Sequence, residues 1–222
     1  RSYEYLPEDN RYIITVQDGE GHIVETIAKQ MSTGWTEEII RYHPDGTILS
    51  TTKYEYNFEE NEAVVTTYTG EGVLVSVERK ELSTNWLTQM TQYGEDGSTI
   101  SDVRYEYSIE DNEIRVTTYR EGVLSEVTIK EMSTGRIKEV THYKEDGVTV
   151  ALVTRYEYSV EDDLITISTY RGDGTMAQLR VKQMSTGWLL EETRYRENGT
   201  VSSVTKYDYA IEEDRVTITT YR

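Results

Sequence analysis

Residues 105–119 read Tyr-Glu-Tyr-Ser-Ile-Glu-Asp-Asn-Glu-Ile-Arg-Val-Thr-Thr-Tyr, and the architecture of the whole chain follows from this stretch. Two segments rich in Tyr, Ile, Val and Thr, which are strand-forming residues, flank the polar pair Asp111-Asn112. Asp and Asn tolerate the left-handed backbone conformation that tight turns require. The stretch therefore predicts a β-hairpin.

A two-residue turn at Asp111-Asn112 would fix the register of this hairpin. The apolar face then pairs Ile109 with Ile114, Tyr107 with Val116, and Tyr105 with Thr118. The polar face pairs Ser108 with Arg115, Glu106 with Thr117, and Arg104 with Tyr119. Other copies of the motif give the corresponding pairs Tyr5–Ile14, Tyr56–Val65, Tyr158–Ile167 and Tyr209–Ile218. One face is apolar and the other polar, as the two-residue period of a half-buried strand demands.

The hairpin recurs along the chain with a period of 51 residues. The Tyr-Glu/Asp-Tyr motif begins at Tyr3, Tyr54, Tyr105, Tyr156 and Tyr207. Two further tyrosine columns follow it at Tyr68, Tyr119, Tyr170 and Tyr221, and at Tyr42, Tyr93, Tyr143 and Tyr195. These columns hold 18 of the 19 tyrosines. We expect one repeat array over residues 1–222, with repeats at about 1–52, 53–103, 104–154 and 155–205 and a terminal hairpin at 206–222.

Each repeat carries four turn signals, of which the Ser-Thr-Gly/Asn and Asp/Asn-Gly turns are the most regular. The segments between them are roughly eight residues long and lack a helical stripe, so every connection is a short hairpin. The sequence predicts an all-β, sequential antiparallel meander of four-stranded repeats that forms a long curled or spiralling sheet. A four-bladed β-propeller is the alternative, although a closed ring has no place for the surplus hairpin.

Composition excludes several classes of function. The chain has 41 Asp+Glu against 23 Lys+Arg, a net charge of −18, which repels nucleic acids and anionic membranes. It has no cysteine and three histidines, so we expect no metal site and no cofactor. Acidic turns such as Asp18-Gly19-Glu20 lack the calcium-loop pattern. No apolar run is long enough for a membrane helix, and because the sequence starts at Arg1, any signal peptide lies outside it.

Two sets of motifs resemble known bacterial repeats. Thr154-Arg155-Tyr156-Glu157-Tyr158, followed by an acidic turn and Gly172-Asp173-Gly174, is similar to the tyrosine-aspartate (YD or RHS) repeats. Tyr195-Arg196-Glu197-Asn198-Gly199 resembles MORN-like repeats. The resemblance implies long spiral sheets that serve as shells or cell-surface scaffolds and are not catalytic. The chain departs from the pattern at Asn57, Ser108 and Ala210, which stand where the family has Asp, and its period is about twice the family's unit.

Aromatic columns are the candidate ligand-binding residues. They are Trp35, Trp86 and Trp188 after the Ser-Thr-Gly/Asn turn, and Tyr68, Tyr119 and Tyr170 on the polar face of the hairpin. In repeat three, Arg136 holds the tryptophan position. An exposed aromatic row can stack on sugar rings or anchor a protein. The alternative is a set of cross-strand ladders that stabilise a sheet short of aliphatic residues.

These observations favour a non-catalytic repeat scaffold for surface adhesion, spacing or partner binding. We expect this protein outside the cell or on a bacterial surface, where it would bind a protein or a glycan. Chains could also associate with one another through their edge strands. A carbohydrate-binding module that uses the Trp and Tyr columns is the alternative. An enzyme is disfavoured, because a catalytic constellation would have to break the repeat and none does.

Overall fold

The structure is a computed structural model that describes residues 1–222, apart from the side chain of Ile211. The chain divides into two compact units. Unit 1 contains Arg1–Tyr105 and Arg120–Gly122, and unit 2 contains Glu106–Tyr119 and Val123–Arg222.

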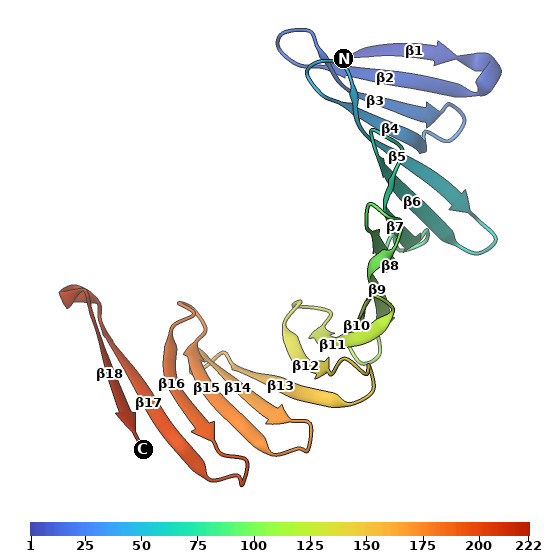
Figure 1. Ribbon diagram of the computed structural model, residues 1–222. Helices are drawn as coiled ribbons and strands as arrows, with labels where there is room; N and C mark the ends of the chain where they lie inside the picture. Colours follow the sequence, from blue (N-terminus) through green and yellow to red (C-terminus); the bar gives the residue numbers. More distant parts are fainter. The chain divides into compact units, whose positions relative to one another are not determined.

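The described residues form strands joined by short turns (Figure 1). The strands of repeats one and two are β1 (Ser2–Leu6), β2 (Arg11–Gln17), β3 (Ile23–Gln30), β4 (Thr36–Tyr42), β5 (Ile48–Asn57), β6 (Glu62–Thr69), β7 (Leu74–Glu81) and β8 (Leu87–Tyr93). Those of repeats three and four are β9 (Thr99–Ser108), β10 (Glu113–Arg120), β11 (Val123–Glu131), β12 (Ile137–Tyr143), β13 (Val150–Ser159), β14 (Leu164–Arg171), β15 (Met176–Gln183) and β16 (Leu189–Tyr195). The last hairpin is β17 (Val201–Ala210) and β18 (Arg215–Tyr221). Single 3₁₀ turns, η1 (Pro7–Asp9) and η2 (Ile211–Glu213), connect β1 to β2 and β17 to β18.

Pairing is antiparallel and sequential, which confirms the predicted all-β meander. The hydrogen bonding also continues through the predicted repeat boundaries. Residues 52/53 and 154/155 lie inside β5 and β13, which pair with both β4 and β6 and with both β12 and β14. A propeller would interrupt the ladder between blades. The propeller alternative is therefore wrong.

The register predicted for the hairpin is wrong by two residues. Tyr156 pairs with Ile167 and Tyr158 with Ile165, whereas the prediction paired Tyr158 with Ile167. The same shift appears in the pairs Tyr3–Ile14, Tyr54–Val65 and Tyr207–Ile218. The turn contains four residues, 160–163, and ends in a left-handed residue, Asp163, at φ 57°. Because the shift equals the side-chain period of a strand, the predicted faces are unchanged.

The two faces of each unit can be distinguished by the paired tyrosines. We call the face that bears Tyr54 and Tyr56 in unit 1, and their equivalents Tyr156, Tyr158, Tyr207 and Tyr209 in unit 2, the tyrosine-pair face. Lys53 and Glu55 alternate with these tyrosines and lie on the opposite face.

Each unit is a single layer of strands (Figure 1). Burial comes from neighbours within the layer: Val65 is 9% exposed and Ile167 is 6% exposed, and both lie on the tyrosine-pair face. Threonine hydroxyls link adjacent strands on the same face, for example Thr154 and Thr169 at 3.2 Å. Among the described side chains none is completely buried. The fold is therefore stabilised by cross-strand pairs rather than by a core between two layers.

Candidate functional site

The tryptophan column packs on the next repeat's tyrosine pair. The ring centroids of Trp35 and Tyr56 are 4.4 Å apart, and those of Trp188 and Tyr209 are 4.5 Å apart. Arg136, which holds the tryptophan position in repeat three, places its guanidinium 5.0 Å from the Tyr158 ring centroid. A stacked ring and a cation over a ring are interchangeable ways to cover the face of a tyrosine.

Each tyrosine in these contacts is also fixed at its hydroxyl. The Oη of Tyr56 donates to the Thr36 carbonyl at 2.7 Å, and the Oη of Tyr158 donates to the Ile137 carbonyl at 3.0 Å. Tyr209 donates to the Leu189 carbonyl at 2.9 Å in the same way. Partial burial raises the pKa of Tyr56 and of Tyr158 above the ordinary value for tyrosine. The hydroxyls of Tyr56 and Tyr158 are therefore neutral donors at physiological pH. All three hydroxyls bind a carbonyl at the start of the preceding repeat's fourth strand.

The second aromatic column lies on the opposite face. Tyr68 pairs with Thr51, and the Lys53 ammonium stands 5.9 Å from the Tyr68 ring centroid. In unit 2, Tyr170 pairs with Val153 and lies under the guanidinium of Arg155, 5.5 Å from its ring centroid. Arg155 in turn donates to Glu139 at 2.8 Å. The prediction paired the tyrosine of this column directly with the cation, as in Arg104–Tyr119, whereas the structure pairs Tyr170 with Val153 and brings Arg155 over the ring from two residues away.

Four of the six candidate residues divide between the two faces. In unit 1, Trp35 is on the tyrosine-pair face and Tyr68 is on the opposite face. In unit 2, Trp188 and Tyr170 are separated in the same manner. Trp86, immediately before β8, and Tyr119, in β10, are half-buried. A ligand lying on one face of a unit cannot contact both aromatic columns.

A side-chain clasp that the sequence reasoning missed joins two turns of each repeat. The left-handed residue of the acidic turn binds the serine of the Ser-Thr-Gly/Asn turn. The Asn61 Nδ2 donates to the Ser83 Oγ at 2.9 Å, and the Ser83 amide donates to the Asn61 Oδ1 at 3.0 Å. Equivalent clasps join Asn10 to Ser32, Asn112 to Ser133, and Asp163 to Ser185.

A backbone hydrogen bond reinforces each clasp, and the clasp lowers the pKa of Asp163. The amide of the residue before each serine donates to the carbonyl of the left-handed residue, as in Met184 to Asp163 at 2.7 Å. Hydrogen bonding from the Ser185 hydroxyl lowers the pKa of Asp163 below its ordinary value. The signal in the sequence is the nearly constant spacing between the Asn/Asp column and the serine column, 22 residues in three clasps and 21 between Asn112 and Ser133.

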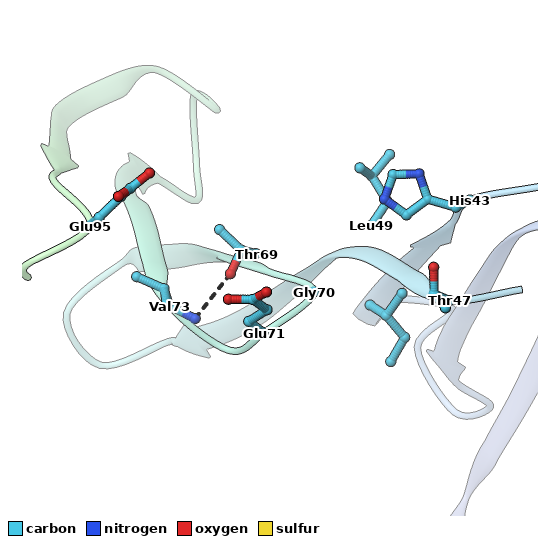
Figure 2. A pocket seen from close by; sticks show the side chains of 9 residues that line it. His43, Thr47, Leu49, Thr69, Gly70, Glu71, Val73 and Glu95 are labelled. Atoms are coloured by element: carbon cyan, nitrogen blue, oxygen red, sulfur yellow. Dashed lines mark hydrogen bonds between the residues drawn. The ribbon is translucent and has the colours of Figure 1, made fainter. Parts of the chain in front are cut away.

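A hollow of about 770 Å³ lies beside the Gly70 turn in unit 1 (Figure 2). His43, Glu71 and Glu95 line it from separate turns (Figure 2). Gly70 is required there, because a Cβ at this position would lie 1.8 Å from the Ile48 carbonyl oxygen.

Unit 2 repeats this hollow around Gly172, with a volume of about 590 Å³. Its charged lining is Lys144, Arg171 and Asp173, so the sign of the charge differs between the two copies. Arg171 already donates to the carbonyls of Met176 and Tyr195 at 2.8 Å. The two hollows therefore do not offer the same chemistry to a common ligand. In the described part of the chain no cluster of His, Asp and Glu is arranged to hold a metal ion.

A search for helices long and apolar enough to cross a membrane finds none among the described residues.

No family model and no curated protein matches the chain. Among solved structures, a porin-like protein from Bacteroides uniformis aligns with 95% of this chain and 88% of its own, at 12% identity and a TM-score of 0.22. The TcdB2-TccC3 structure aligns with 89% of this chain at 12% identity and a TM-score of 0.17, and a Photorhabdus luminescens Tc holotoxin pore aligns with 87% at 10% identity and a TM-score of 0.18. This chain spans 15% of each of those two chains. Similarity of this size carries no argument about function.

Proposed function

We propose that the chain is a non-catalytic repeat scaffold that presents extended sheet surface to a protein partner, outside the cell or on a bacterial surface. The observation that carries this proposal is the single-layer construction. The chain exposes 14432 Å² of surface, whereas a compact monomer of its mass exposes about 10,400 Å². A fold built this way maximises accessible surface per residue instead of enclosing a site.

The local nature of the contacts supports the same function. Each Trp–Tyr contact and each Asn/Asp–Ser clasp joins segments within about half a repeat of one another, so a repeat depends on its neighbours alone. Such an array can change in length without redesign. The Trp column and the Tyr column lie on opposite faces, so together they cannot form a single row on which a glycan would stack.

The experiment that tests this proposal is excision of one repeat, residues 53–103, from the full chain. We expect the shortened chain to keep its β-sheet circular dichroism and a cooperative thermal transition, with a smaller hydrodynamic size. Excision of residues 53–77 is the control, because it joins Thr52 to Glu78, which lie on the same face, so every side chain after the join is turned to the wrong face of the strand. Unfolding of both variants would overturn the proposal, since a spacing scaffold must tolerate whole-repeat changes.

A further inference from the structure

Phe58 lies at the tip of the β5–β6 hairpin in unit 1 and is open to solvent. It is the one phenylalanine of the chain and is 67% exposed. Its ring stacks on that of Trp35, with centroids 4.8 Å apart and planes 26° apart. We call these two stacked rings the aromatic platform. The equivalent turn positions in unit 2 hold Ile109 and Val160, which are aliphatic, so this turn departs from its copies at Phe58.

Two carboxylates follow the exposed ring directly. They belong to Glu59 and Glu60, and both residues are exposed. The Asn57 Oδ1 accepts the amides of Glu59 and Glu60 at 3.1 Å and 3.2 Å, which holds the turn by its backbone. Neither carboxylate makes a hydrogen bond or an ion pair with another residue that the structure describes.

The equivalent turns of unit 2 use serine in place of Asn57. The Ser108 hydroxyl donates to the Asp111 carboxylate at 2.6 Å, and the Ser159 hydroxyl donates to the Asp162 carboxylate at 2.6 Å. One acidic side chain of each of those turns is therefore engaged within the turn. The β5–β6 turn differs from them both in its exposed ring and in its unengaged carboxylates.

The charge on this turn is not neutralised by the neighbouring hairpin strand. In β7, Arg79 pairs with Glu62 at 2.7 Å and Lys80 pairs with Glu78 at 3.1 Å, so both cations are already committed. The chain as a whole carries a net charge of −18. A segment that covers Phe58 therefore meets uncompensated negative charge, and the complementary segment is cationic.

The chain itself contains the kind of contact that such a surface can make. In unit 2, the Arg155 guanidinium stands 5.5 Å from the Tyr170 ring centroid while its Nε donates to Glu139 at 2.8 Å. A second guanidinium, that of Arg136, lies 5.0 Å from the Tyr158 ring centroid. A planar guanidinium can stack on a ring and donate to a carboxylate at the same time, whereas a compact ammonium offers no flat surface to the ring.

We infer that the aromatic platform and the carboxylates of Glu59 and Glu60 form a docking site for an arginine side chain in a basic segment of a protein partner. This inference rests on the proposed scaffold function and names the chemistry of its partner. The guanidinium stacks on the exposed ring of Phe58 and donates to the carboxylates. A second copy of the chain is disfavoured, because it carries the same net charge of −18. A neutral glycan would stack on the ring and leave both carboxylates without a counter-charge.

The test uses the full, isotope-labelled chain and a short glycine-serine peptide with blocked ends and one central arginine. In an NMR titration, the peptide should shift the Trp35 indole N–H and the amides of the β5–β6 turn in a saturable way. The equivalent turns of the other repeats should not shift. A lysine version of the peptide and a citrulline version, which is planar but uncharged, should each bind about threefold more weakly or less.

Variants of the chain test the platform itself. Phe58→Ala should weaken binding of the arginine peptide about threefold, the effect of losing a cation–π contact at an exposed site. Val160→Ala is the matched control, because it removes an exposed apolar side chain from the same turn position in unit 2, and it should leave the affinity unchanged. The repeat-excision variant, in which Ile109 takes the place of Phe58 after the join of Thr52 to Arg104, should fold and should not bind.

Several outcomes would overturn the inference. Equal effects of Phe58→Ala and Val160→Ala, or shifts spread over the acidic turns of every repeat, would show that net charge alone attracts the peptide. Equal affinity for the arginine and citrulline peptides would show that the carboxylates play no part. Shifts of the same amides caused by maltoheptaose, or by raising the concentration of the chain alone, would assign the platform to a glycan or to a second copy. A folded repeat-excision variant together with no arginine binding by the full chain would remove this inference alone and leave the scaffold proposal standing.

Discussion

β14 and β18 are nearly the same strand in two environments. Both follow a Tyr-Glu/Asp-Tyr strand and an acidic turn, and both carry isoleucine at the position that opposes the first tyrosine. Ile167 is covered because β15 lies beside β14, and Ile218 is exposed because β17 is the one strand that pairs with β18 among the described residues. Burial in this fold is therefore a property of the neighbouring strand and not of the hairpin. Stability should follow the same rule, strand by strand.

The largest expected difference concerns these two isoleucines. Ile167→Ala should lower the free energy of unfolding by about 3 kcal/mol, because it deletes covered methylene groups and leaves a cavity. Ile218→Ala should lower it by less than about 0.5 kcal/mol, because the side chain is already in water. Urea denaturation followed by circular dichroism measures both. Equal losses at the two positions would show that an unseen neighbour covers β18 in solution.

A smaller effect sharpens the comparison at the tyrosines. Tyr158 and Tyr209 both donate to a carbonyl of the preceding repeat, so neither bond depends on a strand at the outer edge of β14 or β18. Tyr158→Phe and Tyr209→Phe should each cost about 1 kcal/mol in the free energy of unfolding. If Tyr209→Phe were neutral while Tyr158→Phe was costly, the terminal hairpin would be less firmly held than its hydrogen bonds indicate.

The smallest expected effect is a pH-dependent one at the clasps. The pKa of Asp163 is lowered from 3.8 because its carboxylate accepts hydrogen bonds from Ser185. A carboxylate with a lowered folded-state pKa contributes stability above its unfolded pKa and loses that contribution as pH falls through the folded value. Asp163→Ala should therefore reduce Tm at about pH 7, and the difference from the unmodified chain should narrow below about pH 4.

Asp214→Ala provides the control for that titration. Its carboxylate has no serine to bind within the described residues, so Asp214→Ala should lower Tm by the same amount at every pH, through the left-handed backbone at φ 48° that alanine tolerates less well than aspartate. A Tm difference for Asp163→Ala that stays constant down to about pH 2 would indicate that the ionised carboxylate is not what holds the turn.

Much of the fold could be predicted from the sequence because the period of 51 residues multiplies every weak signal. The strand segments, the positions of the turns and the two faces are confirmed, but the length of the acidic turn is not. The hairpin register was wrong because a shift of two residues keeps each side chain on its face, so hydrophobic alternation cannot detect it. The left-handed conformation of Asp163 and its equivalents, which sets the four-residue turn, is a property of the whole turn rather than of the Asp-Asn dipeptide.

The candidate site was less predictable for a related reason. Trp188 and Tyr170 both belong to aromatic columns that recur with the repeat. The spacing of a column does not determine the face of the sheet on which a residue lies when an irregular turn or a bulge precedes it. The clasp between Asp163 and Ser185 joins two turns whose motifs are each fully explained by turn formation. Nothing in either motif alone requires the other.

The sequential ladder also has a consequence for how the chain folds. Contacting residues in this fold are close in sequence, because strands pair through short turns and each clasp spans about 22 residues. The sequence separation of contacts is therefore about one tenth of the chain length or less. All-β proteins usually fold slowly because distant segments must meet, with relative contact orders of about 0.16–0.22. Here each hairpin can close on its neighbour soon after both have been synthesised. The chain should therefore fold at rates more typical of helical bundles, and it should do so progressively, from whichever repeat forms first.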